Sequence, residues 1–174
     1  MALFRFEDRI PVVGKDSWVA ESAEVIGKVI IGDNCYIGHG ARLRGDYGTI
    51  DIGDFSIVED NCVMHARPDD ICKIGKHVTI GHGAVVHNAT LHDWVMIGMG
   101  AIVADFAVVG EWGVVGEGAV VRNKQEIPAG KVAVGVPAKV IADVRDDYKE
   151  LWTGYKGLYA KLAKRNMVGL KRVD

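Results

Sequence analysis

Residues 25–43, VIGKVIIGDNCYIGHGARL, place an aliphatic residue at every sixth position: Val25, Ile31, Ile37 and Leu43. The same spacing resumes after two interruptions and continues to Val121, and glycine often follows the aliphatic residue. A fixed short period of this kind is the sequence mark of a β-helix built from hexapeptide repeats, whereas neither an amphipathic helix nor an alternating strand has a period of six. The sequence therefore predicts an all-β coil over most of the chain.

The coil geometry predicts which residues lie above one another. Three hexapeptides make one coil of 18 residues, so residues 18 apart should stack on neighbouring strands about 4.8 Å apart. The two interruptions add three residues between positions 43 and 52 and four between positions 64 and 74. With these extras subtracted, Arg44 to His65 is 21 minus 3 and His65 to His87 is 22 minus 4, so both are 18. Arg44, His65 and His87 are therefore predicted to form one column.

His82 is predicted to lie on a different face from this column. The same subtraction places His82 above Asp60 and Asp60 above His39. Two histidines one rung apart can share a metal ion, each with a nitrogen about 2.0–2.1 Å from it. His82 could join them only from a neighbouring chain, and three such contacts would close a ring. The sequence thus predicts a homotrimer with a metal site at each subunit boundary, made by His65, His82 and His87. Zn²⁺ is the expected metal, and Fe²⁺ or Co²⁺ accepts the same ligands.

The composition is typical of one domain with a sizeable core, since 49% of the 174 residues are hydrophobic. A net charge of −2 gives no reason to expect nucleic-acid or membrane binding. The first ten residues resemble no signal peptide, and no apolar segment is long enough to span a membrane. Three cysteines without CxxC spacing, Cys35, Cys62 and Cys72, are interpreted as reduced thiols of a cytoplasmic protein.

The chain is expected to form a single domain in two parts. Residues 1–142 hold a lead-in, the coils to about residue 121 and an exit stretch in which Pro128 and Pro137 cannot donate to a strand ladder. Residues 143–174 are expected to form a C-terminal helix over about 143–164, packed along the coils with its apolar stripe covered. That stripe recurs at three- and four-residue spacings, at Val144, Tyr148, Leu151, Tyr155, Leu158, Tyr159 and Leu162.

Five motifs resemble the γ-class carbonic anhydrases and their γ-carbonic-anhydrase-like relatives in the bacterial transferase hexapeptide family. They are RGD at 44–46, EDNCVMH at 59–65, IGHGAVVH at 80–87, IGMGAIV at 97–103 and GVPAKVI at 135–141. The resemblance extends from about residue 8 to the helix. Hexapeptides alone are shared with many acyltransferases, but the two histidine-bearing motifs are far more specific.

The resemblance implies a left-handed parallel β-helix, an exception to the usual right-handed crossover, assembled as a trimer. It also implies that His65 and His87 of one chain share a metal with His82 of the next, in agreement with the column arithmetic. The implied activity is the reversible hydration of carbon dioxide to bicarbonate, because a metal held by three neutral histidines lowers the pKa of bound water towards about 7.

Further site residues follow from the resemblance. Arg44 and Asp46 match residues that form ion pairs at the subunit boundary, and Asp60 matches an acid near the site. Tyr159 is similar to a tyrosine of the C-terminal helix that leans towards the metal, although it could equally be a residue of the packed stripe. Glu59 stands where the family usually has glutamine. Its carboxylate could accept a proton from bound water or fill the open metal position, or it could pair with a nearby arginine.

The acidic loop that carries the proposed proton shuttle in active relatives is not matched here. Asp69 and Asp70, in the second interruption, are candidate shuttles or simply residues of a solvated loop, so slow turnover is expected. Two alternatives to carbon dioxide hydration remain open. One is an acyl-CoA thioesterase or acyltransferase on the same scaffold, and the other is a catalytically silent trimer that binds metal for stability.

Overall fold

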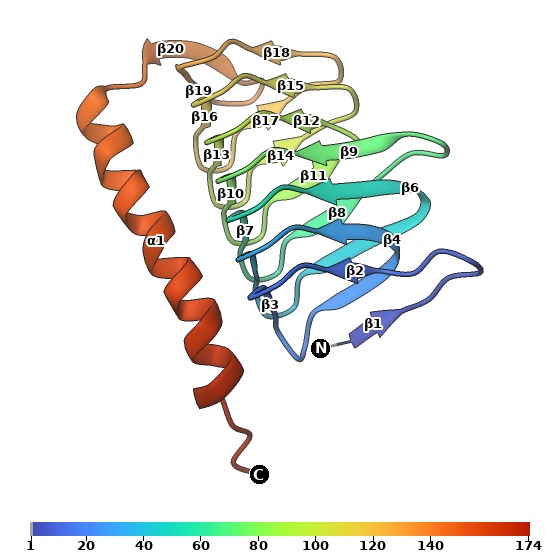
Figure 1. Cartoon of the computed structure of the whole chain (residues 1–174). Coiled ribbons are helices and arrows are strands. Elements are labelled where there is room, and N and C mark those ends of the chain that lie inside the picture. Colours follow the sequence, from blue (N-terminus) through green and yellow to red (C-terminus); the bar gives the residue numbers. More distant parts are fainter. Residues whose placement is uncertain (1) are drawn as a thin grey trace.

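The computed structural model describes residues 2–174 and confirms the predicted fold class, a left-handed parallel β-helix with one C-terminal helix. Each coil places one short strand on each of three faces, and α1 (Asp146–Gly169) runs beside the stack (Figure 1). Strands from successive coils pair in parallel along the axis. Residues about 18 apart in the sequence are therefore neighbours in space.

The first two faces join into one sheet because β4 (Glu24–Ile31) and β6 (Arg42–Ile52) are long enough to contribute to both. Face 1 is completed by β1 (Ala2–Phe4), β8 (Val63–His65), β11 (Val85–His87), β14 (Ile102–Val103) and β17 (Val120–Val121). Face 2 is completed by β2 (Val12–Val13), β9 (Ile71–Ile74), β12 (Thr90–Leu91), β15 (Val108–Val109) and β18 (Glu126–Ile127).

Face 3 is a separate sheet, and α1 lies alongside it. Its parallel strands are β3 (Trp18–Val19), β5 (Tyr36–Ile37), β7 (Ile57–Val58), β10 (Thr79–Ile80), β13 (Met96–Ile97), β16 (Val114–Val115) and β19 (Lys131–Val134). The antiparallel strand β20 (Lys139–Asp143) closes the last coil and leads into the helix.

The six-residue ladder forms the core, as predicted. Its members from Val25 to Val121 are no more than 2% exposed. Each ladder side chain packs against those of the coils above and below, which gives the close packing typical of a protein interior. The backbone register pairs Arg44 with His65 and His65 with His87, so the predicted column is confirmed.

The three cysteines form no disulfide, as predicted, and all three are buried. Burial raises the pKa of the Cys62 thiol to about 12 and those of Cys35 and Cys72 to about 11. Thiols that stay protonated at neutral pH are poor nucleophiles and poor metal ligands. They therefore act as small core residues.

Two predicted boundaries are wrong. The second interruption, between positions 64 and 74, is expected from its four extra residues to form a protruding loop over residues 66–73, but the loop is shorter because residues 71–74 form β9 and pair with β6. The chain also stays in the repeat beyond residue 121, since β18 and β19 pair in parallel with β15 and β16. Pro128 is tolerated because it follows the last residue of β18, where its missing N–H interrupts no strand.

The helix begins at Asp146 and ends at Gly169, later than expected at both ends. Its predicted stripe is covered only in part, because Leu151, Tyr155 and Leu158 are about half exposed. The covered side instead carries Lys156 and Ala163, with Tyr159 and Leu162 packed against the core. Among residues 2–174, no helix is long and apolar enough to cross a membrane.

Lys156 fixes the rotation of the helix. It is only 3% exposed, and its ammonium group donates hydrogen bonds to the His77 carbonyl and to Thr79 Oγ1 (2.9 Å) on face 3. No carboxylate contacts it among the hydrogen bonds and ion pairs of residues 2–174. Burial without a counter-charge lowers the pKa of Lys156 to about 7. These hydrogen bonds, together with the packing of Tyr159, Leu162 and Ala163 on the core, hold this face of the helix against face 3.

The low pKa of Lys156 predicts that the protein becomes more stable as the pH rises from 7 towards 10.5. In this window an unfolded lysine keeps its proton while the folded one loses it, so the cost of burying the charge disappears. Relative to Lys156→Met, the wild-type free energy of unfolding should gain about 2 kcal/mol between pH 7 and 9. Urea titrations at both pH values and one protein concentration measure this difference. Parallel pH profiles for the two proteins would contradict it.

Candidate functional site

His65 and His87 face each other on adjacent coils of face 1. His65 ends β8 and His87 ends β11, and the two residues are partners in the strand register. His65 Nδ1 lies 3.1 Å from His87 Nε2. The ladder sets this approach, because it holds the two strands one rung apart.

Each imidazole is held by a carboxylate on its outer side. Asp46 Oδ1 lies 2.9 Å from His65 Nε2, and Asp105 Oδ1 lies 2.7 Å from His87 Nδ1. Asp46 also pairs with Arg44, whose Nη1 is 3.1 Å from Asp46 Oδ2. Burial acts to raise the pKa of Asp46, but the hydrogen bond from His65 and the charge of Arg44 hold it below its usual value. Asp46, His65, His87 and Asp105 therefore form one continuous polar chain.

This arrangement suits two ligands of one metal ion. Two nitrogens each 2.0–2.1 Å from a tetrahedral metal are separated by roughly 3.3–3.4 Å, close to the observed 3.1 Å. Carboxylates bonded to the outer nitrogens of metal-binding histidines orient the rings and raise their basicity. Within residues 2–174 of one chain, no three His, Cys, Asp or Glu side chains come together as a metal site. A metal ion bound by this pair would need its third ligand from elsewhere.

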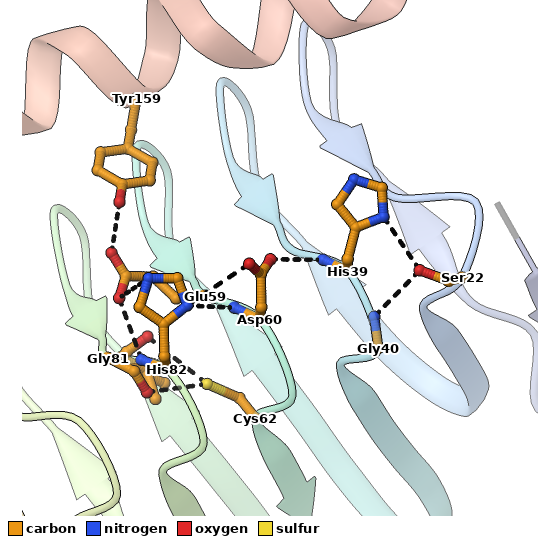
Figure 2. Close-up of polar contacts among 10 residues, drawn as sticks. Ser22, His39, Gly40, Glu59, Asp60, Cys62, Gly81, His82 and Tyr159 are labelled. Carbon is orange, nitrogen blue, oxygen red and sulfur yellow. Dashed lines mark hydrogen bonds and ion pairs between the residues drawn. The ribbon is translucent and has the colours of Figure 1, made fainter. Parts of the chain in front are cut away.

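His82 lies at a corner of face 3 and contacts neither His65 nor His87 among the described hydrogen bonds. The Asp60 backbone N–H donates to His82 Nδ1 (3.2 Å), which leaves Nε2 to carry the proton that faces Glu59 Oε2 (3.2 Å) (Figure 2). The His82 side chain is 48% exposed. The ring is exposed, but both of its nitrogens have partners within the chain, and the structure does not bring it to the His65–His87 pair. To bind a metal ion, His82 would have to give up its proton and its contact with Glu59 at Nε2.

Glu59 is the most buried acid near His82, with 9% of its surface exposed. Its Oε1 accepts a hydrogen bond of 2.6 Å from Tyr159 Oη, and its Oε2 accepts one of 3.1 Å from the His82 backbone N–H (Figure 2). Burial and the hydrogen bond to Glu59 raise the pKa of Tyr159 far above its usual value. Glu59 thus pairs with Tyr159 and His82, not with an arginine. Tyr159 reaches Glu59 from the helix and its ring also packs against the core, so it is a residue of the packed stripe as well. Its expected approach to a metal stays a prediction.

Asp60 stabilises the corner that carries His82. Its Oδ1 accepts the His39 backbone N–H at 2.7 Å, and its Oδ2 lies 3.6 Å from His82 Nδ1 (Figure 2). The predicted order of His39, Asp60 and His82 along one corner is therefore confirmed. In this chain Asp60 positions His82 and fixes the turn below it.

Sequence reasoning missed Asp105. The step from Val86 to Leu91 is five residues, whereas the coil above takes six from Val103 to Val109, so one residue in the corner that holds Asp105 has no partner below. Asp105 lies at the corner directly after the rung above His87, and Arg67 Nη1 also contacts its Oδ2 at 3.3 Å. The irregular step is the signal that could have identified it.

Asp70, one of the two candidate proton shuttles, is held by hydrogen bonds within the protein. Its Oδ2 accepts a 2.8 Å hydrogen bond from the buried Asn88 side chain, and this bond holds the pKa of Asp70 below its usual value. Asn88 Oδ1 in turn accepts the Arg67 backbone N–H at 3.0 Å. These contacts give Asp70 a structural role in fixing the loop between β8 and β9.

Known proteins resemble this chain in sequence and in structure. A family model described as bacterial transferase hexapeptide (six repeats) matches residues 10–45. Carnitine operon protein CaiE of Escherichia coli is 35% identical over 147 residues, covering 84% of this chain and 75% of that protein. A solved hexapeptide transferase family protein from Anaplasma phagocytophilum superposes with a TM-score of 0.88 at 32% identity, over 94% of this chain and 96% of that one.

A plant protein is also similar. Gamma carbonic anhydrase 1, a mitochondrial protein of Arabidopsis thaliana, is 40% identical over 146 residues, which cover 80% of this chain and 53% of that protein. The chain thus spans about half the length of this relative.

Replacing Tyr159 with phenylalanine should destabilise the protein by about 1.5–3 kcal/mol, because a buried carboxylate loses a charge-assisted hydrogen bond. Tyr155→Phe is the matched control: its ring is on the exposed side of the same helix, and its effect should stay within about 0.5 kcal/mol. Urea unfolding at pH 7 measures both free energies. Equal stabilities of the two variants would show that the Tyr159–Glu59 bond contributes nothing.

Proposed function

The chain belongs to the bacterial transferase hexapeptide family, and from this membership we propose that it is a metal-dependent enzyme that reversibly hydrates carbon dioxide to bicarbonate. The observation that carries the proposal is the His65–His87 pair, with nitrogens 3.1 Å apart and a carboxylate behind each ring. The similarity to a plant γ-carbonic anhydrase supports this activity over others that the family supports.

The third ligand in this proposal is His82 of a neighbouring chain. His82 is exposed at a corner of the coil, and the pair that it would join lies on face 1 of another molecule. Because the two patches differ, the contact is head to tail and forms a closed ring when its rotation closes. We propose three subunits, the number that the resemblance to the γ-class carbonic anhydrases implies. Arg44, about half exposed beyond Asp46, is placed to extend the ion pair across this boundary.

The donor set favours Zn²⁺, and Fe²⁺ or Co²⁺ fits the same three nitrogens. When bound, such an ion supplies a nucleophilic hydroxide at neutral pH by lowering the pKa of its water. Asp46 and Asp105 hold the two imidazoles in the tautomers and orientations that a ligand needs. Glu59, fixed by Tyr159, offers a buried hydrogen-bond acceptor beside His82.

A second candidate activity acts on acyl groups. The Anaplasma relative is described as a hexapeptide transferase family protein. An apolar groove that begins at Glu59 and His82 favours a substrate larger than carbon dioxide. This candidate uses the same residues, so direct assays have to separate the two.

Stopped-flow measurement of carbon dioxide hydration tests the proposal, using anaerobically purified protein of measured metal content. Turnover should follow metal content and fall by more than about 100-fold in His87→Ala, which removes a ligand. His92→Ala, at an exposed histidine on face 2, should keep both metal and turnover.

Two results would count against the proposal. Full metal occupancy without turnover would contradict carbon dioxide hydration and favour an acyl substrate or a silent scaffold. Equal metal content in His87→Ala and the wild type would contradict the proposal that His87 is a metal ligand.

A further inference from the structure

A groove runs between α1 and the strands β10, β13, β16 and β19 of face 3, which are the upper strands in Figure 1. Its volume is about 450 Å³. It begins beside Glu59 and His82 and is lined further along by the strand residues Met96, Val114 and Val132 and by the helix residues Tyr148 and Trp152. Most of this lining is apolar. The end at Glu59 and His82 is therefore polar, whereas most of the remaining lining is apolar.

The groove exists because the helix covers face 3 unevenly. The outward-facing residues of the lower strands, including Tyr36, Ile57 and Thr79, are at least nine-tenths buried. Those of β16 and β19, Val114 and Val132, are only half-buried. The helix comes closest to β3 and β5, so its first turns leave the upper strands partly uncovered.

Glycines shape the floor. The residue after each ladder position on this face is Gly81, Gly98 or Gly116 on three successive coils, and all three line the groove. One coil below, the same place in the register is held by Glu59. Backbone without side chains is thus continuous along the groove, and a single carboxylate closes its lower end.

The length follows from the coil spacing. The lining runs from β10 through β13 and β16 to β19. Three strand spacings of about 4.8 Å give a groove of about 14 Å. Carbon dioxide does not need a groove of this length, and water gains few hydrogen bonds along apolar walls.

We propose that this groove binds the unbranched aliphatic chain of a ligand whose uncharged polar head lies at Glu59 and His82. The apolar lining selects the chain, and the carboxylates of Glu59 and Glu117, the latter also part of the lining, disfavour an anionic ligand. The chain site stands on the groove alone. Any chemistry at the head rests on the proposed function, because it requires the centre that His82 helps to form.

Binding of 1-alkanols from butanol to dodecanol tests the inference, measured by calorimetry on the intact protein. Each methylene that enters the groove should strengthen binding about fourfold, until the chain exceeds about 14 Å and the affinity levels off. Val114→Phe narrows the middle of the groove and should abolish this chain-length dependence. Val132→Phe narrows the groove near its far end, so the affinity should level off at a shorter chain length. This variant tests the inference if Val114→Phe does not fold.

Val108→Phe is the matched control, because Val108 is a half-buried valine on face 2, away from the groove. It should keep the wild-type profile. Affinities that do not depend on chain length, or that are equal in Val114→Phe and Val108→Phe, would overturn the inference. If the protein hydrates carbon dioxide but its affinity for alkanols does not depend on chain length, the groove inference is wrong and the proposed function stands. If the affinity depends on chain length but carbon dioxide is not hydrated, the groove inference stands and the proposed function is wrong.

Discussion

The stacking of coils about 4.8 Å apart around an aliphatic ladder is the constraint on which the rest of the molecule depends. It makes residues about 18 apart in the chain into neighbours, which brings His65 against His87 and places Asp46 and Asp105 on either side. The strands that carry His65 and His87 are each three residues long, so an isolated strand could not hold a site. The continuous ladder supplies the rigidity that a pair of metal ligands requires.

Much of this could be predicted from the sequence, since a ladder with a fixed period also fixes the register once its interruptions are counted. The column of Arg44, His65 and His87 followed in this way. Asp105 did not, because the ladder register, counted from Val86 and Val103, places Ala104 rather than Asp105 above His87. The rotation of the helix could not be predicted either. Its apolar pattern favoured burying Leu151 and Leu158, whereas the buried face carries Lys156, which donates hydrogen bonds to face 3.

The site divides between two faces of the coil. The imidazole pair lies on face 1, while Glu59, His82 and Tyr159 meet where face 3, its corner and the helix come together. In one chain these two groups are not in contact, and His82 is bonded to its own Glu59. In the proposed oligomer, a neighbouring subunit brings the two groups together. The mouth of the apolar groove would then lie beside the proposed metal centre.

The most direct test of this account asks whether a metal site is shared between chains. His82→Ala and His87→Ala chains each lack one ligand, so each alone should bind little Zn²⁺. Refolded together in equal amounts, they should regain metal at about a quarter of the sites, one half times one half, because a His82→Ala chain followed by a His87→Ala chain completes a site. Zinc analysis of the mixed oligomer measures the recovery. A mixture that binds no more zinc than the separate variants would contradict a centre built from two subunits.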